Sequence, residues 1–433
     1  MGQYLNIMKI KNFYKVFFNI IIIITILLAS IYIFYKYKPD IVSKYFLNKI
    51  IPHDLKVQIR KDFIEKNLKK HINTYSKNQF IDLKLDKVEL GFDYNKSSRV
   101  NYKVYNNYSH IDIWQNKLIL ANHDGDFYLF DLDKIYTRDF IKKKIPSNLN
   151  TLSEPPYFGV KDILIDKNKI YVAYVIEQKK NCLSIFIDVA DLSLKRLDFK
   201  NFFSPKECVN ASDTLYKKNH PGQAGGRLAK YKNNKILLTT GNFRSPNVSQ
   251  RSDSIYGKTL SIEKNNNFEI LSLGHRNPQG LYTDGDLIIQ TEHGPYGGDE
   301  INLILKGGNY GFPIASFGEK YSYRKKQENF DYLKDHEGFI EPIFSFVPSI
   351  GISEIIKVPK DFSKYWYNNY IVTSLNGRSI FRIKFDENFT KIQFYEKIFI
   401  GERIRDIKYS KLLNSFILAL EESGSLGILS SPQ

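Results

Sequence analysis

The feature that most constrains the fold of this chain is a β-rich pattern that recurs six times. In each unit an apolar run leads through a polar turn into a second apolar run, and a third run follows after a loop. The units occupy residues 111–132, 160–189, 225–262, 278–304, 353–385 and 405–429. Short strands repeated in this way are typical of sheets arranged radially around an axis. We therefore predict an all-β fold, a six-bladed β-propeller that occupies residues 85–433.

The N-terminus differs from the repeated part. Residues 16–35 contain no charged side chain, and a helix of about 20 apolar residues can cross a bilayer. We predict a short cytoplasmic N-terminus at residues 1–15, an uncleaved transmembrane signal-anchor at 16–35, and a stalk or linker at 36–84. In the stalk Leu55, Ile59 and Phe63 recur at helical spacing, which predicts a short amphipathic helix.

The formal net charge of +17 raises the question of nucleic-acid binding. Residues 1–80 hold 14 Lys/Arg and 4 Asp/Glu, a net charge of +10, and the remaining residues contribute only +7. Basic groups beside an apolar span favour an anionic membrane surface. This distribution indicates a membrane partner and no nucleic-acid partner.

The chain has two cysteines, Cys182 and Cys208. An even count permits one disulfide outside the cytoplasm, and two buried free thiols are the alternative. The sequence leaves both open.

Chemically distinctive residues gather in the segment 274–313, GHRNPQGLYTDGDLIIQTEHGPYGGDEINLILKGGNYGFP. His275, Arg276 and Asn277 precede a proline, and propeller loops of this kind converge on the central axis. The glycine-rich turn at Gly294-Pro295 can direct carbonyl oxygens outward, as Ca²⁺ requires. Asp299 and Glu300 follow it as further candidate ligands, with a turn cap and a solvated face as the alternatives.

These motifs resemble the core signature of the soluble quinoprotein glucose/sorbosone dehydrogenases, which include bacterial aldose sugar dehydrogenases. The matching stretches are GHRNPQGL, EHGPYGGDEINLI and GGNYGFP, supported by GGRLAKYKNNKILLTTGN (225–242) and GERIRDI (401–407). The resemblance covers roughly residues 85–430. It implies a propeller that holds pyrroloquinoline quinone (PQQ) and Ca²⁺ on its axis and oxidises aldoses by hydride transfer.

The resemblance also assigns roles to particular residues. Arg276 and Asn277 match the residues that hold the quinone carbonyl side of the cofactor, and Gly294 and Pro295 match the carbonyl ligands of the calcium. The pair at 403 and 405 matches two arginines that bind the cofactor carboxylates. Two arginines one residue apart on a strand point to the same face, and each presents a fork that fits a carboxylate. Surface ion pairs are the alternative for Arg403 and Arg405.

Several positions depart from the family pattern. The family places its catalytic histidine four residues before the arginine of GGR, where this chain has Gln223, whose amide is not basic. His220 is the first candidate to replace it as the base, and His275 is a weaker one. A family lysine in the fifth blade is replaced by Asn376, and Arg378 is a candidate to supply the lost charge. His123 in the first blade is interpreted as surface decoration, with a position facing the axis as the alternative.

Two functions follow from this pattern. The first is a membrane-anchored, PQQ- and calcium-dependent sugar dehydrogenase in the inner membrane, with its propeller in the periplasm and a respiratory electron acceptor. The second is a catalytically degenerate propeller that binds a ligand or partner. A nicotinamide cofactor is disfavoured, because no GxGxxG opens a helix after a strand.

Overall fold

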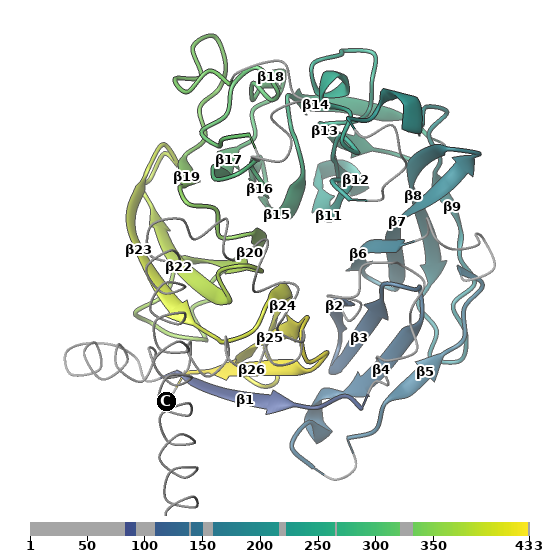
Figure 1. Ribbon diagram of the computed structural model, residues 1–433. Helices are drawn as coiled ribbons and strands as arrows, with labels where there is room; N and C mark the ends of the chain where they lie inside the picture. The colour runs from purple at the N-terminus through teal and green to yellow at the C-terminus, as the bar shows by residue number, and fades with distance from the viewer. Residues whose placement is uncertain are drawn as a thin grey trace, which may run out of the picture. The chain divides into compact units, whose positions relative to one another are not determined.

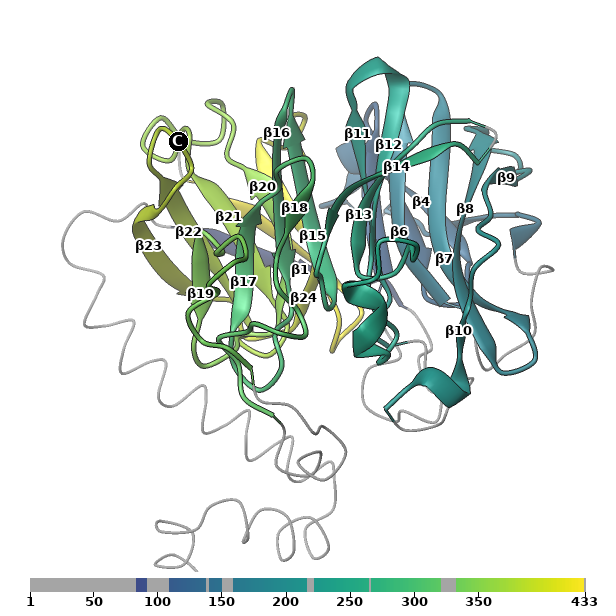
Figure 2. The ribbon, with the colours of Figure 1, turned by 90° about the horizontal axis from the view of Figure 1, so that it is seen from above.

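Six sheets stand around a central axis in the part of the chain that the structure describes (Figure 1). The computed structural model describes residues 83–91, 109–137, 140–149, 159–215, 222–264, 266–320 and 332–431. All of them lie in the second of two units of the chain, Ile81–Gln433. Seen from above, the strands run roughly along the axis (Figure 2). The predicted six-bladed β-propeller is confirmed.

Each blade is one sheet, and its first strand is the innermost. Blade 1 contains β2 (Ser109–Trp114), β3 (Lys117–Asn122), β4 (Phe127–Asp131) and β5 (Lys143–Ile145). Blade 2 contains β6 (Gly159–Asp166), β7 (Lys169–Lys179), β8 (Cys182–Asp191), β9 (Lys200–Phe203) and β10 (Val209–Asn210). Blade 3 contains β11 (Gly225–Tyr231), β12 (Lys235–Thr240), β13 (Lys258–Ile262), β14 (Phe268–Leu273) and β18 (Gly308–Asn309).

Blade 4 contains β15 (Pro278–Asp284), β16 (Leu287–Glu292), β17 (Asp299–Leu303) and β19 (Phe344–Phe346). Blade 5 contains β20 (Ile352–Lys357), β21 (Tyr370–Ser374), β22 (Ser379–Phe385) and β23 (Ile392–Phe399). Blade 6 contains β24 (Ile404–Ser410), β25 (Ser415–Leu420) and β26 (Leu426–Ser430), together with β1 (Lys84–Val88). Short 3-10 helices lie at Leu132–Lys134, Ala211–Asp213, Lys232–Asn234 and Pro246–Ser249.

The ring is closed by a strand from the opposite end of the sequence. β1 pairs antiparallel with β26, from Lys84 opposite Ser430 to Val88 opposite Leu426, and the two lie side by side in Figure 1. The last blade therefore takes its outermost strand from the start of the described chain. This pairing leaves no gap in the ring, and no edge between the first and last blades has to stay exposed.

Apolar side chains fill the space between the blades. In the described residues they form six clusters, one between each pair of neighbouring blades. The cluster between blades 2 and 3, for example, includes Phe203 and Phe243. A sheet covered on both faces needs apolar residues on both faces, which explains why β12 and β25 are buried along almost their whole length.

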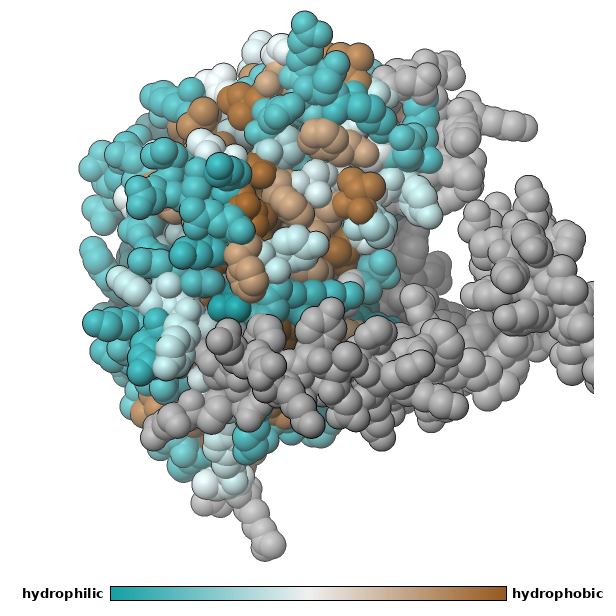
Figure 3. Space-filling model, turned by 90° about the vertical axis from the view of Figure 1, so that its left-hand side faces the viewer, coloured by the Kyte–Doolittle hydropathy of each residue, from teal (hydrophilic) through white to brown (hydrophobic). Residues whose placement is uncertain are grey.

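The outer wall is more mixed. Figure 3 views the molecule from the side on which β23 lies in Figure 1, and hydrophobic residues gather there among hydrophilic ones. Blade 5 contributes Phe394 and Tyr395 from β23 to the exposed hydrophobic residues, and Tyr365 and Tyr367 from the loop before β21.

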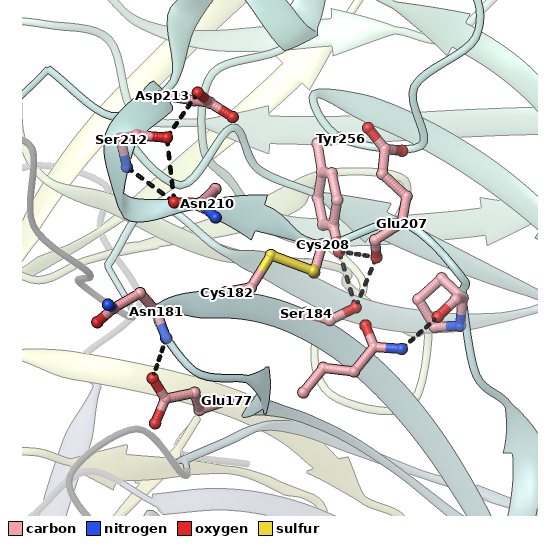
Figure 4. The surroundings of a disulfide bond; sticks show 12 residues. Glu177, Asn181, Cys182, Ser184, Glu207, Cys208, Asn210, Ser212, Asp213 and Tyr256 are labelled. Carbon is pink, nitrogen blue, oxygen red and sulfur yellow. Dashed lines mark hydrogen bonds between the residues drawn. A yellow bond between two sulfur atoms is a disulfide. The ribbon is translucent and has the colours of Figure 1, made fainter.

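The two cysteines form a disulfide in the structure. Cys182 begins β8, and Cys208 lies immediately before β10, the strand that pairs with β8 (Figure 4). Beside the bridge, the Tyr256 hydroxyl contacts Ser184 Oγ at 2.8 Å and the Glu207 carbonyl oxygen at 3.0 Å. The bridge therefore holds β10 against β8 at the outer edge of blade 2. Of the two alternatives that the sequence left open, the structure shows the disulfide.

The predicted anchor and almost all of the predicted stalk lie outside the described residues. Lys84, the last residue assigned to the stalk, already begins β1. None of the helices in the described ranges is long and apolar enough to cross a membrane.

We predict that replacing both cysteines by serine destabilises the folded chain. The disulfide closes a loop with a sequence separation of 26, and a cross-link of this span stabilises by about 3 kcal/mol through the entropy of the unfolded chain. Urea unfolding followed by tryptophan fluorescence measures the change. An unfolding free energy equal to that of the oxidised parent protein would show that the disulfide does not stabilise the fold.

Candidate active site

Five of the six innermost strands carry a β-bulge that faces the axis. The register shifts lie between Val160 and Asp162 in β6, Gly225 and Leu228 in β11, Pro278 and Gly280 in β15, Ile352 and Ile355 in β20, and Ile404 and Asp406 in β24. A bulge adds a residue to one strand and redirects its side chain. The residues inside these bulges are Lys161, Gly226, Arg227, Gln279, Ser353, Glu354 and Arg405. We call these bulge residues, together with the residues that contact them, the axial site.

The buried guanidinium of Arg227 contacts all the other inner strands. Its partners are His110 Nδ1 (3.2 Å) on β2, Asp162 Oδ1 (3.2 Å) on β6, the Gln279 carbonyl oxygen (2.6 Å) on β15, Glu354 Oε2 (3.1 Å) on β20, and on β24 the Arg405 carbonyl oxygen (2.7 Å) and Asp406 Oδ2 (3.6 Å). One side chain therefore links every blade at the axis. We call Arg227 and these side-chain partners the axial ion cluster.

The carboxylates of this cluster also accept backbone N–H groups from neighbouring blades. Asp162 accepts from Leu228 (2.8 Å), Glu354 from Leu281 (2.9 Å) and Asp406 from Ile111 (3.0 Å). Each carboxylate therefore holds an adjacent inner strand in place, and hydrogen bonds offset part of the cost of burying its charge.

Burial sets the protonation of the axial ion cluster. Burial raises the pKa of Asp162 to about 7, although Arg227 opposes the change. Burial would also raise the pKa of Asp406, but Lys408, Arg227 and His110 hold it below its ordinary value. Burial lowers the pKa of His110 to about 3, so its imidazole is neutral near pH 7. His110, Asp162 and Asp406 place ligand atoms within 4.8 Å of one another, but the Arg227 guanidinium already supplies the cation there.

The arginine pair lies directly beside this cluster. Arg405 donates to Gln279 Oε1 (3.0 Å) and to Glu421 Oε2 (2.9 Å), and Arg403 lies 3.6 Å from Glu421 Oε1. Both guanidinium groups thus reach one buried carboxylate, so they occupy the same side of blade 6. They are largely buried at 15% and 13% side-chain exposure, which differs from an ordinary surface ion pair.

Arg276 and Asn277 join the same axial site. Asn277 Oδ1 accepts from Gln279 Nε2 (3.1 Å) and from the Gly225 N–H (3.4 Å), while Arg276 donates to the His293 carbonyl oxygen (3.0 Å). Since Gln279 also accepts from Arg405, a continuous chain of hydrogen bonds joins Asn277 to Arg405. The structure thus brings residues 276, 277 and 405 together.

The turn at Gly294 and Pro295 is tight. A Cβ atom added to Gly294 would lie 2.1 Å from the Gly298 carbonyl oxygen, so only glycine fits there. The Asp299 carboxylate closes the turn by accepting from the Gly294 N–H (3.1 Å), and it also accepts from Ser349 Oγ and from the N–H groups of residues 350 and 352. Asp299 is therefore the cap of this turn and fixes it to β20.

The structure places Glu300 away from a solvated face. Its side chain is buried and accepts from Asn302 Nδ2 at 3.3 Å, and His336 Nε2 lies 3.9 Å from it. Burial, reinforced by Glu292, raises the pKa of Glu300 well above its ordinary value.

Two interpretations of histidines are wrong. His275 is fully buried, with Nε2 bonded to Ser272 Oγ (2.8 Å), Nδ1 to Glu292 (2.9 Å), and its ring stacked on Tyr310. Because both nitrogens are engaged inside the protein, His275 cannot serve as a base for a substrate. His123 is buried rather than surface decoration, and its ring packs where a Cβ of Gly159 would lie.

The region of the predicted base is described in part. His220 lies outside the described residues, so its role stays a prediction. Gln223 has a positive φ of 60°, and its carbonyl oxygen accepts from the Phe243 N–H (2.9 Å). The adjacent Asn242 is fully buried, and its Nδ2 has no hydrogen-bond partner in the described part of the chain. The Asn242 N–H donates to the Arg276 carbonyl oxygen, so this unsatisfied donor lies at the axial site.

Arg378 reaches blade 6, whereas Asn376 stays beside blade 5. Arg378 has a positive φ of 47° and donates to Glu422 Oε1 at 2.5 Å. Asn376 packs its backbone against Gly351. The charge of Arg378 is therefore paired with a carboxylate within this structure.

Sequence reasoning missed the roles of Lys161, Gln279 and Arg227. A signal for two of them was present, because glycine or proline inside a strand indicates a bulge, and Arg227 follows Gly225-Gly226 while Gln279 follows Pro278. Gly159, at the start of β6, gives only a weak signal of this kind two residues before Lys161. The position of Lys161 becomes visible only in the paired sheet.

Fold and site together define a six-bladed propeller with an ion cluster on its axis and several cationic side chains beside it. The sequence model of the glucose/sorbosone dehydrogenase family matches residues 158–428. The chain belongs to this family.

Individual relatives agree with this assignment. The aldose sugar dehydrogenase YliI of Escherichia coli K12 is 30% identical over 220 residues, which are 47% of this chain and 58% of that protein. The quinoprotein glucose dehydrogenase B of Acinetobacter calcoaceticus is 54% identical over 56 residues, 12% of each chain. The matches thus span less than two thirds of these relatives. A PQQ-bound aldose sugar dehydrogenase from Streptomyces coelicolor has the same fold, with a TM-score of 0.58 and 16% identity, covering 82% of this chain and 100% of that one.

We predict that Arg227→Leu lowers the unfolding free energy by about 3–5 kcal/mol, because the variant leaves buried carboxylates unpaired. The loss should be larger at pH 8 than at pH 5, since unpaired buried carboxylates have raised pKa values and become destabilising as they ionise. Urea titrations at the two pH values measure it. Arg196→Leu, which removes an exposed pair with Asp198, is the matched control. Equal losses in the two variants would contradict the role of Arg227.

Proposed function

We propose that this chain oxidises an aldose-type sugar by hydride transfer to PQQ, which is bound on the propeller axis with Ca²⁺. The observation that carries the proposal is the arginine pair Arg403 and Arg405, whose guanidinium groups both reach the buried carboxylate of Glu421. A guanidinium group can also bind a ligand carboxylate, through two parallel N–H···O bonds. The E. coli relative is an aldose sugar dehydrogenase, and the Streptomyces protein binds PQQ, as their names state.

The residues at the axis fit a planar tricarboxylate. Arg403 and Arg405 would bind its carboxylates, and Arg276 and Asn277 would bind its quinone side. The unsatisfied Asn242 Nδ2 is a buried donor beside Arg276, and a buried donor without a partner is costly unless a ligand completes it. The carbonyl oxygens of Gly294 and Pro295 would hold the calcium, in a turn whose shape is fixed by Asp299. When bound, the cofactor supplies the hydride acceptor, and the ion makes that acceptor more electrophilic.

We further propose that residues 16–35 anchor the chain in the inner membrane, with the propeller in the periplasm and a respiratory electron acceptor nearby. The disulfide between Cys182 and Cys208 supports an oxidising compartment. A reporter fused after Gln433 should be active only outside the cytoplasm. Activity confined to the cytoplasm would contradict this topology.

The alternative is a propeller that binds a ligand without turnover, and Gln223 is the observation that favours it. Adding PQQ and Ca²⁺ to the purified full chain and following aldose-dependent dye reduction separates the two functions. Cofactor uptake without dye reduction for any aldose would support the binding module. Dye reduction that a calcium chelator abolishes and added Ca²⁺ restores would support the dehydrogenase.

We predict that the double variant Arg403→Met/Arg405→Met binds PQQ about 10²–10⁴-fold more weakly, because each lost charge-assisted contact costs about 1.5–3 kcal/mol. Equilibrium titration of cofactor absorbance measures the affinity. The control is Arg382→Met, which removes a pair with Glu396 on blade 5. Unchanged affinity in the double variant would show that the arginine pair does not bind the cofactor.

A further inference from the structure

Lys161 occupies a position at the axis that neither the motifs nor the assigned roles explain. It is the residue inside the bulge of β6, between Val160, which pairs with Tyr174, and Asp162, which pairs with Ala173. Its side chain passes over Gly226 of β11. A Cβ atom added to Gly226 would lie 2.3 Å from Lys161 Cβ and 3.0 Å from its Cγ. The bulge and the missing side chain of Gly226 together make room for the lysine between blades 2 and 3.

The surroundings of Lys161 favour its neutral form. Burial, followed by the nearby positive charge of Arg405 on β24, lowers the pKa of Lys161 to about 7. His123 approaches from the loop between β3 and β4. Burial, followed by the positive charge of Lys161, lowers the pKa of His123 well below its ordinary value. His123 therefore adds no positive charge near pH 7. On β11 the packed residue is the uncharged Gly226. The next carboxylate on β6, Asp162, is held by Arg227 and the Leu228 N–H.

Several other polar groups at the axis do not fit the task of a base. His275 has both nitrogens bonded inside blades 3 and 4. His110 contacts Arg227 within the axial ion cluster. The amide of Gln223 is not basic, and guanidinium groups stay protonated. A lysine amine tuned by burial toward neutral pH is a known solution for general-base catalysis.

We propose that Lys161 is the general base of this propeller and takes the place of the histidine that position 223 lacks. This inference rests on the proposed function. The neutral amine of Lys161 takes the proton of the sugar hydroxyl and becomes an ammonium group. The electron pair of the broken O–H bond forms a carbon–oxygen double bond, and the adjacent C–H bond breaks with its hydride passing to the quinone. The sugar loses two electrons and two hydrogens, and the quinone gains the two electrons.

Two variants of Lys161 separate a base from a group that only binds the cofactor. Lys161→Arg keeps a positive charge on a long stem but removes the proton acceptor, and Lys161→Met removes both. For a base, Lys161→Arg lowers kcat by about 10²–10⁴-fold, keeps the affinity for PQQ within about threefold, and loses the rise of kcat with pH. Lys169→Arg, at the exposed start of β7 beside Asp191, is the matched control and keeps the parent kcat and pH profile.

Two outcomes would overturn the assignment. One is a Lys161→Arg variant that turns over at the parent rate while His220→Ala does not. The other is a Lys161→Met variant whose only defect is weaker PQQ binding, with the parent kcat at saturation.

A second measurement tests Lys161 without cofactor or sugar. The rate of trinitrobenzenesulfonate labelling, followed residue by residue with peptide mass spectrometry, reports the fraction of neutral amine. The labelling midpoint should lie at about pH 7 for Lys161 and slightly above that of an ordinary lysine for Lys169, whose pKa is raised by its contact with Asp191. A midpoint near that of an ordinary lysine would contradict the proposal even if the chain oxidises sugars. Failure of the parent chain to oxidise any aldose would instead contradict the proposed function.

Discussion

The contact between Arg227 and the carboxylates around it is the interaction on which the rest of the axial structure depends. The guanidinium meets Asp162, Glu354 and Asp406 from three other blades, and it also binds two backbone carbonyl groups. The apolar clusters between the blades supply most of the favourable free energy, because they bury large areas without direction. The axial ion cluster adds contacts that are specific, because each charged group must meet its own partner. A buried charge without its partner is costly, so a shift of an inner strand along the axis is unfavourable because it would separate such a pair.

The same bulges that assemble this cluster also build the candidate active site. In β24 the bulge places Arg405 beside Glu421, while the next residue, Asp406, belongs to the ion cluster. In β6 the bulge holds Lys161, and Asp162 follows it into the cluster. In each of these two pairs, the first residue belongs to the candidate active site and the second belongs to the axial ion cluster. This coupling explains why cationic groups can be kept close together despite their repulsion. Their backbone positions are fixed by the cluster next to them.

Much of the fold could be predicted from the sequence, because strand alternation and turn residues are local signals. The six repeated units correspond to the six blades. The pairing of β1 with β26 could not be predicted, since it joins residues more than three hundred positions apart and depends on ring closure. The segment from His275 to Pro295 could be located because its residue types are unusual for a blade, and the arginine pair because GERIRDI resembles the family motif. The burial of these residues and their hydrogen-bond partners could not be predicted.

The histidines show most clearly that the sequence alone does not predict which side chains become buried. His275 stands in the most distinctive motif, yet it is bonded to Ser272 and Glu292 inside the protein. His123 stands in an ordinary polar turn, yet it is buried near Lys161 and Arg405. Both outcomes depend on how neighbouring blades cover the turn, which periodicity in one strand does not contain. Lys161 was missed for the same reason. A lysine in a strand is normally solvated, and the bulge that packs Lys161 against Gly226 is seen only in the paired sheets.

The central claim is that this axis holds a quinone that a sugar can reduce. Its most direct test is a single-turnover experiment on the full chain loaded with PQQ and Ca²⁺ and mixed rapidly with an aldose in the absence of any electron acceptor. The account predicts that the absorbance of the bound quinone changes to that of its reduced form in an amount equal to the loaded protein. It also predicts that the rate rises with pH near neutrality. A loaded protein whose bound quinone stays oxidised in the presence of every aldose would contradict the account.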